Sequence, residues 1–375
     1  MIGLPNETAE GRRCVALVPE VVTKLVDLGA EVRVERSAGN AAYLYDAAFE
    51  EAGAVLVDDG DTIYADSDVV VRIHPPEASE ITSVKKGAIL IGFLAPFRGG
   101  DIVTTLRDNG VTSIAMELVP RISRAQAMDA LSSQASIAGY KAALMAANLL
   151  GKFMPMLTTP TGTIRPAQVI VIGAGVAGLQ AVATARRLGA IVSAYDVRSA
   201  TKEQIQSLGA KFIELDISAE GEGGYARELT DEEKKMQQDQ LGTYIARADA
   251  VITTAAIPGR ASPKIIKTEM VEAMRPGSVI IDLAAEGGGN CELTKAGEMV
   301  DHGGVNVYGP LKVPDMVPVH ASETFAKNIY NMIALMVAEG EFSPDWEDDV
   351  LSGSLLTRDG EIIHEATKQM IEGSN

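Results

Sequence analysis

Residues 166–200, PAQVIVIGAGVAGLQAVATARRLGAIVSAYDVRSA, constrain the fold of this chain more than any other segment. The apolar run VIVI predicts a buried strand, and LQAVATARRL predicts a helix that ends at Gly189. AIVSAY predicts a second strand, and Asp196 follows it directly. A glycine-rich turn between a strand and a helix binds phosphates in dinucleotide-binding folds. This order of elements predicts a parallel α/β domain that binds a dinucleotide.

The three glycines of the GxGxxG turn have separate expected roles. Gly173 allows the tight turn, Gly175 lets a pyrophosphate approach the backbone, and Gly178 lets the helix pack closely on the strand. Val176 and Ala177 begin the helix, whose N-terminal N–H groups point toward the phosphates. We expect all five residues to contact the nucleotide.

Asp196 predicts which nucleotide binds. A carboxylate at the end of the second strand accepts a hydrogen bond from the adenine-ribose 2′-OH, and it repels the 2′-phosphate of NADP. We therefore expect NAD(H) as the cofactor, with Val197 also beside it. Arg198, which is also expected at the nucleotide, is the one nearby feature that weakens the preference for NAD(H).

Strand and helix patterns alternate through the first 120 residues and again from about residue 167 to 309. This alternation predicts two Rossmann-like, doubly wound parallel-sheet domains of the α/β class, with a cleft between them. We expect one domain from residues 1–134 and 321–375 and a nucleotide domain from 135–320. A helix is predicted over 137–155, a linker at TTPTGTIRPAQ, an amphipathic helix near 321–340, and a small β-element in the tail SGSLLTRDGEIIHEA.

Composition excludes several classes of function. The net charge is −18, which argues against direct binding to nucleic acid or anionic lipid. No apolar run approaches the ~18 residues that a membrane span needs. The N-terminus lacks the apolar stretch of a signal peptide, so we expect a soluble, cytoplasmic protein. Cys14 and Cys291 have no metal-type spacing, and we expect reduced thiols and no metal site.

The segment RISRAQAMDALSSQ, residues 121–134, has an unusual helical pattern. At 100° per residue, an apolar stripe of Ile122, Ala125, Met128 and Leu131 lies only about 70° from a polar stripe of Gln126, Asp129 and Ser132. A surface helix usually has its polar stripe on the opposite side. The polar stripe is therefore either the edge of an ordinary helix or a set of side chains that faces a cleft.

Three further segments fit a nucleotide site. VITTAAIPGR (251–260) predicts a strand that ends in small residues, where a dinucleotide could cross the sheet edge. GSVIIDLAAEGGGN (277–290) predicts another strand, which ends at Asp282 before a glycine-rich loop. Residues 216–240 are a polar insertion around Tyr225, and they form either a surface loop or a lid over the nicotinamide.

Several motifs resemble one family, the alanine dehydrogenase/pyridine nucleotide transhydrogenase family, over essentially the whole chain. They are RISRAQAMDALSSQASIAGYKA, GAGVAGLQA, ATKEQIQSLGAKFIELD, GGYARE, TTAAIPGR and GSVIIDLAAEGGGNC. The first motif and the tyrosine motif are similar to the NAD(H)-binding component of proton-translocating transhydrogenases.

The resemblance implies the site residues. Those at the nicotinamide end of NAD(H) are Arg121, Ile122, Ser123, Gln126, Asp129 and Ser132, where Gln and Ser side chains hold the carboxamide. Tyr225 lies on a mobile loop, Gly224 and Gln237 lie beside the cofactor, and Ala255 and Ala256 lie against it. The residues implied in hydride transfer are Arg121, Gln126, Asp129, Ser132 and Tyr225.

The resemblance also implies a reaction without a general acid or base. A hydride passes directly from NADH to NADP⁺ held by a partner subunit, so two nicotinamides must meet with water excluded. Proton movement through a separate membrane subunit is coupled to this step. The chain would be cytoplasmic, peripheral to the inner membrane through its partners, and homodimeric.

NAD-dependent alanine dehydrogenase is the alternative, because it shares the fold. That enzyme has a Lys after the fourth strand and a His after the fifth, whereas this chain has Arg72 and His74 in the first place and Ala95 in the second. A His beside two prolines is more often structural than catalytic, because catalysis needs a placed partner.

The N-terminal motif also departs from the family. Cys14 stands where the family commonly has Arg, and Arg13 on a strand would point to the other face. A third hypothesis, a non-catalytic NAD(H) sensor or structural subunit, conflicts with the presence of Gln126, Asp129, Ser132 and the Tyr225 loop.

Overall fold

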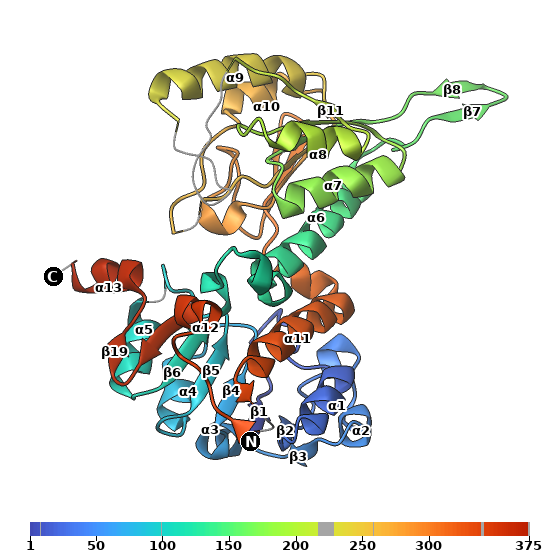
Figure 1. Cartoon of the computed structure of the whole chain (residues 1–375). Coiled ribbons are helices and arrows are strands. Elements are labelled where there is room, and N and C mark those ends of the chain that lie inside the picture. Colours follow the sequence, from blue (N-terminus) through green and yellow to red (C-terminus); the bar gives the residue numbers. More distant parts are fainter. Residues whose placement is uncertain (8, 99, 217–228, 258, 339–340, 374–375) are drawn as a thin grey trace. The chain divides into compact units, whose positions relative to one another are not determined.

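The computed structural model describes residues 1–7, 9–98, 100–216, 229–257, 259–338 and 341–373, which form two compact units (Figure 1). The first unit contains residues 1–134 and 314–375, and the second contains 135–313. The chain leaves the first unit inside helix α6 (Ala130–Leu149). Within the described part of the chain, no helix combines the length and the apolar character needed to cross a membrane.

An eight-stranded sheet forms the centre of the first unit. Its strands are, in spatial order, β3 (Val55–Val57), β2 (Val32–Glu35), β1 (Ile2–Leu4), β4 (Val69–Val71), β5 (Ile89–Gly92), β6 (Thr112–Ala115), β18 (Leu355–Arg358) and β19 (Glu361–Ile362). The strands from β3 to β6 are parallel, and the strand order reverses between β1 and β4. The antiparallel pair β18–β19 at the edge is the β-element predicted in the tail.

Helices in two groups cover this sheet (Figure 1). One group is α3 (Gly60–Asp66), α4 (Ala78–Ser83) and α5 (Gly100–Asp108); the other is α1 (Pro19–Asp27), α2 (Asp46–Glu51) and α11 (Pro318–Ala334). The short helices α12 (Asp349–Ser354) and α13 (Glu365–Glu372) flank β18 and β19. Every residue of β1, β4, β5 and β6 is buried, as strands covered on both faces require.

Helix α11 confirms the amphipathic pattern near the C-terminus, although it begins and ends earlier than predicted. It starts with Pro318 at its first position, where proline is favoured. Its apolar face is fully buried and consists of Phe325, Ile329, Met332 and Ile333, with Met336 just beyond the helix.

A seven-stranded sheet forms the centre of the second unit. Its strands are, in spatial order, β11 (Lys211–Phe212), β10 (Ile191–Tyr195), β9 (Gln168–Ile172), β12 (Ala250–Thr253), β13 (Val279–Asp282), β15 (Val305–Tyr308) and β14 (Met299–His302). All are parallel except β14, and the order reverses between β9 and β12. Two doubly wound sheets confirm the predicted α/β class.

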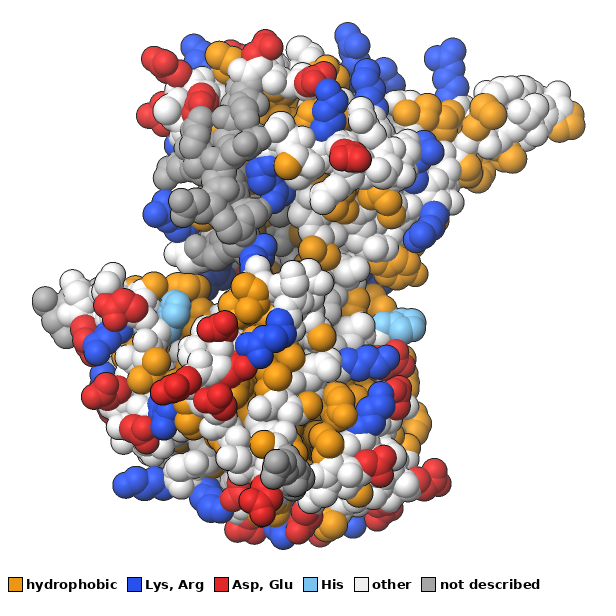
Figure 2. All heavy atoms as spheres, in the orientation of Figure 1, with side chains coloured by type: hydrophobic (Ala, Val, Ile, Leu, Met, Phe, Trp, Pro, Cys, Tyr) orange, Lys and Arg blue, Asp and Glu red, His pale blue; other side chains and the backbone are white. Residues whose placement is uncertain are grey.

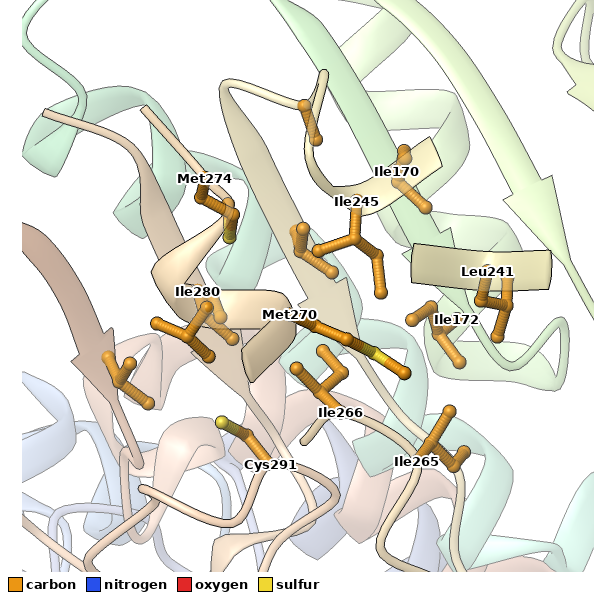
Figure 3. Packing of buried hydrophobic residues seen from close by; sticks show 14 of the residues in the cluster. Ile170, Ile172, Leu241, Ile245, Ile265, Ile266, Met270, Met274, Ile280 and Cys291 are labelled. Atoms are coloured by element: carbon orange, nitrogen blue, oxygen red, sulfur yellow. The ribbon is translucent and has the colours of Figure 1, made fainter. Parts of the chain in front are cut away.

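A hydrophobic core of the second unit lies between its sheet and two helices, α9 (Asp231–Ile245) and α10 (Thr268–Glu272). Leu241 and Ile245 of α9 and Met270 of α10 pack toward Ile170 and Ile172 of β9 (Figure 3). The remaining helices are α7 (Val176–Arg187) and α8 (Thr201–Ser207), which contact each other, and α6. A Cβ added to Gly139 of α6 would lie 2.0 Å from the Ala177 carbonyl oxygen, so the backbones of α6 and α7 touch.

Three local predictions were wrong. Helix α6 begins before residue 137 and ends at Leu149, ahead of Pro155. The predicted linker is a hairpin of β7 (Leu157–Thr159) and β8 (Gly162–Ile164), because Gly162 adopts a φ of 127° that allows the chain to turn. The second part of the polar insertion is α9, whose first turn is closed by a capping box between Thr230 and Glu233. The short strands β16 (Val337–Ala338) and β17 (Glu341–Phe342) pair antiparallel.

Candidate functional site

The glycine turn joins β9 to α7 at the point where the strand order of the second unit reverses. Gly173 has a φ of 92°, a conformation that favours glycine. A Cβ on Gly178 would lie 1.8 Å from the Gly173 carbonyl oxygen, so only glycine fits there. A Cβ on Gly175 would meet no atom within 4 Å. The turn is therefore closed on the protein side and open at Gly175, which suits the approach of a pyrophosphate.

Helix α7 begins directly at this opening. Gly175 is its N-cap, and Val176 in the first turn is 43% exposed although it is apolar. The first N–H groups of a helix have no partner inside the helix, and the helix dipole makes them attractive to anions. Val176 and Ala177 thus lie where the predicted phosphate contacts need them.

Asp196 ends β10 and faces the same turn. Its Oδ2 accepts a hydrogen bond from the Ala174 N–H of the turn at 2.7 Å. Its Oδ1 accepts from the Arg198 N–H at 2.9 Å, and the Arg198 guanidinium also binds the carboxylate. Val197 between them is half-buried against the core of the unit. The carboxylate therefore holds the shape of the glycine turn in addition to its predicted contact with ribose.

The end of β12 lies beside the turn. The Thr254 hydroxyl donates to the Gly173 carbonyl oxygen at 3.1 Å. Asn290 receives the Ala255 N–H at 3.0 Å and donates to the Ala255 carbonyl oxygen at 2.8 Å. Ala256, the next residue, is exposed. Ala255 and Ala256 are both expected at the nucleotide. They follow β12, whose end is hydrogen-bonded to the glycine turn through Thr254 and to Asn290 through Ala255.

Sequence reasoning missed the role of Asn290, and Asp282 explains how it is placed. Asp282 is fully buried at the end of β13, and its Oδ2 accepts the N–H groups of Asn290 at 2.7 Å and of Cys291 at 3.0 Å. The Thr294 hydroxyl donates to the same oxygen at 2.6 Å. An aspartate at a strand end followed by GGGN was the available signal, since a buried carboxylate must find donors.

Gln237 lies on α9, where it is buried and donates to the Tyr195 hydroxyl at 3.1 Å. Burial raises the pKa of Tyr195 to about 12, so the hydroxyl stays protonated near neutral pH. Tyr195 is the last residue of β10 and immediately precedes Asp196. Gln237 therefore makes its hydrogen bond to the residue next to Asp196 and not to Asp196 itself. Gly224 and Tyr225, the other residues predicted in this segment, are outside the described residues.

Residues 121–134 are not one helix, and this corrects the predicted pair of stripes. A 3-10 helix, η3 (Ser123–Met128), precedes α6, and Ala125 and Met128 are buried at its three-residue period. Ile122 and Leu131 are exposed, at 40% and 37%, so the expected four-residue apolar stripe does not form. The two helices are separated at Asp129, whose backbone is not helical, with a φ of −71° and a ψ of 85°.

Two of the polar residues in this segment pair with each other. Asp129 accepts the Ser132 N–H at 2.9 Å and the Ser132 hydroxyl at 2.6 Å, as a helix cap does at the start of α6. Gln126 is exposed, and no described residue makes a hydrogen bond to its side chain. Arg121 and Ser123 are also exposed. The segment therefore presents Gln126 and uses Asp129 and Ser132 to hold its own backbone.

Helix α11 anchors this segment. Asn328 donates to the Ala127 carbonyl oxygen at 2.8 Å and accepts from the Ser133 hydroxyl at 2.8 Å. The Gln134 amide donates to the Ala321 carbonyl oxygen at 3.1 Å. All these residues belong to the first unit, whereas the glycine turn and Asp196 belong to the second.

In the first unit, the place where the strand order reverses is filled by charged side chains. Glu7 follows β1 and accepts the N–H groups of Ile73 at 2.7 Å and His74 at 2.9 Å, which follow β4. The His74 ring lies between two carboxylates, with Nδ1 3.0 Å from Glu7 and Nε2 3.5 Å from Asp315 of η6 (Val313–Met316). Because the two carboxylates contact opposite ring nitrogens, His74 connects the segment that follows β1 with η6.

Arg72 completes this network. Its side chain is 1% exposed, and it lies 3.0 Å from Glu80 and 3.9 Å from Glu7. The Arg72 guanidinium also donates to the Tyr64 hydroxyl at 2.6 Å and to the His74 carbonyl oxygen at 2.7 Å. The Arg72 guanidinium is thus already bound by groups of the protein.

Cys14 lies in a loop, which corrects the strand expected there. The N–H groups of Arg13 and Cys14 both donate to Asp315, at 2.6 and 2.9 Å, and the Arg13 side chain reaches Tyr43 at 2.8 Å. Burial, with the nearby Asp315 charge, raises the pKa of the Cys14 thiol, which therefore stays protonated.

Ala95, where the alternative enzyme has its His, is held by Glu117. The backbone of Ala95 is left-handed, with a φ of 50°, and the Glu117 carboxylate accepts its N–H at 2.8 Å. Glu117 is nearly buried, and burial raises its pKa to about 7. Glu117 lies in η2 (Met116–Leu118), after β6, and it holds the backbone of the loop after β5, whose described residues include no histidine.

Comparison with known proteins reveals matches over both units. Models of the two domains of one family match the chain: alanine dehydrogenase/PNT, N-terminal domain, over residues 3–138, and alanine dehydrogenase/PNT, C-terminal domain, over residues 142–365. An NAD(P) transhydrogenase subunit alpha protein of Rhodospirillum rubrum is 45% identical, with 97% of this chain and 98% of that protein covered. NAD(P) transhydrogenase subunit alpha of Haemophilus influenzae is 42% identical over 99% of this chain and 73% of that protein.

Alanine dehydrogenase of Mycobacterium tuberculosis is more distant, at 29% identity over 97% of this chain and 95% of that protein. Among solved structures, the transhydrogenase also has a higher sequence identity to this chain than the alanine dehydrogenase does. The transhydrogenase from Sinorhizobium meliloti superposes with a TM-score of 0.86 at 39% identity, over 97% of this chain and 99% of that one. An L-alanine dehydrogenase superposes with a TM-score of 0.83 at 25% identity, over 100% and 99%. The fold is common to both groups, and the sequence is closer to the transhydrogenases.

Proposed function

The chain belongs to the alanine dehydrogenase/pyridine nucleotide transhydrogenase family, a family of oxidoreductases, and from this we propose that it is the NAD(H)-binding subunit of a proton-translocating NAD(P) transhydrogenase. NAD(H) binds the second unit, at the glycine turn and Asp196. The first unit, 1–134 with the C-terminal segment, supplies the residues around the nicotinamide. NADP(H) is held by a partner subunit.

The contrast between the two points of strand reversal is the observation that carries this proposal. Ligands of open α/β sheets bind at such points. In the second unit this place is open at Gly175 and offers helix N–H groups. In the first unit it is filled by Glu7, His74 and Asp315. Among the described residues, this arrangement supports a nucleotide site in the second unit, whereas charged side chains fill the corresponding place in the first unit.

The proposed chemistry is direct hydride transfer. A hydride leaves C4 of the NADH nicotinamide with its electron pair and reaches C4 of the NADP⁺ nicotinamide, so NADH becomes NAD⁺ and NADP⁺ becomes NADPH. No proton is exchanged with a side chain, and the protein acts by positioning the two rings and excluding water. Gln126 and Arg121, with Ser123 and Ile122, are the proposed contacts of the carboxamide, and the family resemblance also assigns Tyr225 to this site. Asp129 and Ser132 hold the backbone of this segment.

The proposed assembly has three kinds of partner. They are an NADP(H)-binding subunit, a separate membrane subunit that moves protons, and a second copy of this chain. The chain would act in the cytoplasm at the inner membrane, attached through these subunits. Its acidic surface supports no contact with nucleic acid.

Alanine dehydrogenase remains the alternative, and the first unit argues against it. A keto acid needs a free cation for its carboxylate, but His74 lies between two carboxylates and Arg72 is bound to Glu80 and Tyr64. Purified protein with NADH, pyruvate and ammonia should show no NADH oxidation. Turnover in this assay would replace the transhydrogenase proposal by the alternative.

The positive test is hydride transfer in the complete complex. Protein mixed with the NADP(H)-binding partner should transfer hydride between the two nucleotides, and Gln126→Ala should cut the transfer rate at least about tenfold with little change in the Kd of NADH. An equal loss of rate and affinity would show that Gln126 contributes only uniform binding. No transfer by the wild type would favour a nucleotide sensor.

A further inference from the structure

The Asp196 carboxylate has no acceptor position left for a ligand. A carboxylate accepts about four hydrogen bonds, two on each oxygen. Oδ1 receives the Arg198 N–H at 2.9 Å and Nε at 2.8 Å, and Oδ2 receives the Ala174 N–H at 2.7 Å and Arg198 Nη2 at 2.8 Å. The Asp196 side chain is only 6% exposed beneath the guanidinium.

A ribose hydroxyl can bind this carboxylate only if one donor moves away. The Ala174 N–H belongs to the glycine turn, and the Arg198 N–H belongs to the backbone that follows β10, so both are held in place. The guanidinium is the group that can rotate, since it is at the end of a long side chain that is 22% exposed. Nucleotide binding is therefore coupled to the position of Arg198.

The same ion pair changes the charge that a nucleotide meets. A bare carboxylate at this position repels a 2′-phosphate. Here the guanidinium offsets that charge, and it carries a planar set of N–H donors directly beside the carboxylate. Guanidinium groups bind phosphate in this bidentate manner.

We propose that Arg198 is a specificity-determining residue of the nucleotide site. With NADH, the guanidinium gives up one Asp196 oxygen to the ribose 2′-OH and keeps the other. With NADPH, it leaves Asp196 and pairs with the 2′-phosphate, so the site accepts this nucleotide weakly instead of excluding it. This inference rests on the proposed NAD(H) site.

The test measures Kd for NADH and for NADPH separately, by nicotinamide fluorescence with the full chain. In Arg198→Ala, the Kd of NADPH should rise at least about tenfold relative to the Kd of NADH, the change that loss of one charge-assisted contact causes. Arg187→Ala, which removes an exposed arginine from the last turn of α7, is the matched control and should leave both constants unchanged. Adding Asp196→Asn to Arg198→Ala should restore part of the NADPH affinity.

The outcomes separate this inference from the proposed function. If the wild type fails to bind NADH, the nucleotide site itself is wrong. If NADH binds, the inference is overturned by a wild type that does not bind NADPH at millimolar concentration. It is also overturned if Arg198→Ala leaves the ratio of the two constants unchanged, or lowers the Kd of NADPH.

Discussion

Gly175 and Gly178 belong to the same turn, but only Gly178 is packed against other atoms of the protein. The space beside the Gly178 Cα is filled by the Gly173 carbonyl, whereas the space beside the Gly175 Cα is empty. Gly175 also has an ordinary extended backbone, with a φ of −75°, that any residue can adopt. One glycine is therefore needed for folding and the other for access of the ligand.

This difference predicts that alanine at the two positions has different effects on stability and on NADH binding. Gly178→Ala should lower the Tm clearly and abolish NADH binding, because the added methyl group forces β9 and α7 apart. Gly175→Ala should leave the Tm nearly unchanged and weaken NADH binding at least about tenfold, since the methyl group would occupy the proposed path of the pyrophosphate. Thermal unfolding and fluorescence titration of both variants check this. An unstable Gly175→Ala protein, or one with normal affinity, would contradict the separation.

Asp129 and Gln126 offer a second matched pair. Asp129 caps α6, so Asp129→Ala should lower the free energy of unfolding by about 1 kcal/mol, the usual loss for a helix cap. Gln126→Ala should leave it unchanged, because the side chain is exposed and makes no hydrogen bond to a described residue. Denaturant unfolding measures both. A destabilised Gln126 variant would indicate a structural role and weaken its proposed role at the nicotinamide.

The segments that meet beside β1 and β4 form a network whose stability depends on protonation of His74. Burial alone would lower the pKa of His74, but its contacts with Asp315 and Glu7 outweigh this and raise the pKa. Burial alone would raise the pKa of Glu7 and of Asp315, yet the contacts with His74 lower both. An imidazolium donates from both nitrogens, whereas a neutral ring donates from only one.

The raised pKa predicts how stability changes with pH. The contribution of His74 should be complete below about pH 6.5, the pKa of an unfolded histidine, and should be lost as pH rises through the higher folded pKa. The contribution of the two carboxylates is lost in acid, below about pH 4. The network is therefore most stable in mildly acidic solution.

Thermal unfolding between about pH 6 and about pH 9 measures this effect. The wild type should lose roughly 2–4 °C relative to His74→Gln across this range, the shift that about 1 kcal/mol causes in a domain of 150–250 residues. The glutamine variant retains a polar side chain without the titration. Parallel curves for the two proteins would show that His74 carries no coupled charge.

At the scale of the whole molecule, the hairpin β7–β8 extends away from the rest of the second unit (Figure 1). Apolar side chains gather on it (Figure 2), and Met156, Leu157 and Ile164 are 63%, 40% and 36% exposed. Exposed apolar side chains that gather on one element are typical of a contact with another chain, among other uses. This supports the proposed homodimer.

Polar substitution of the arm tests that assembly. Leu157→Gln with Ile164→Gln should convert a dimer into monomers in sedimentation velocity experiments, because the variants remove apolar area from the contact. Val55→Gln, at a 50% exposed position on β3, is the control and should not change the mass. Monomeric wild-type protein would remove the homodimer from the proposal, and dimeric arm variants would place the contact elsewhere.

Sequence patterns alone predicted the α/β class, the glycine turn, Asp196 and the apolar face of α11, because each depends on local periodicity or on a backbone requirement within a few residues. Local patterns did not predict that residues 121–134 are divided between the 3-10 helix η3 and the start of α6. The 3-10 helix there is held by Asn328 of α11, which is distant in sequence. Asp129 and Ser132 have the spacing of a helix cap, but local periodicity by itself favours one continuous helix through them.

The arrangement around His74 shows most clearly what only the tertiary structure decided. Glu7, Arg72, His74 and Asp315 come from three distant segments, and no spacing rule relates them. They meet because the three connections from β1 through β2 and β3 to β4 bring β4 beside β1, and η6, just before α11, lies at the same place. The sequence by itself determined which elements form and where one nucleotide turn lies, since those depend on neighbouring residues. Which charged groups neutralise each other depended on the packing of the whole unit, because burial decides their partners.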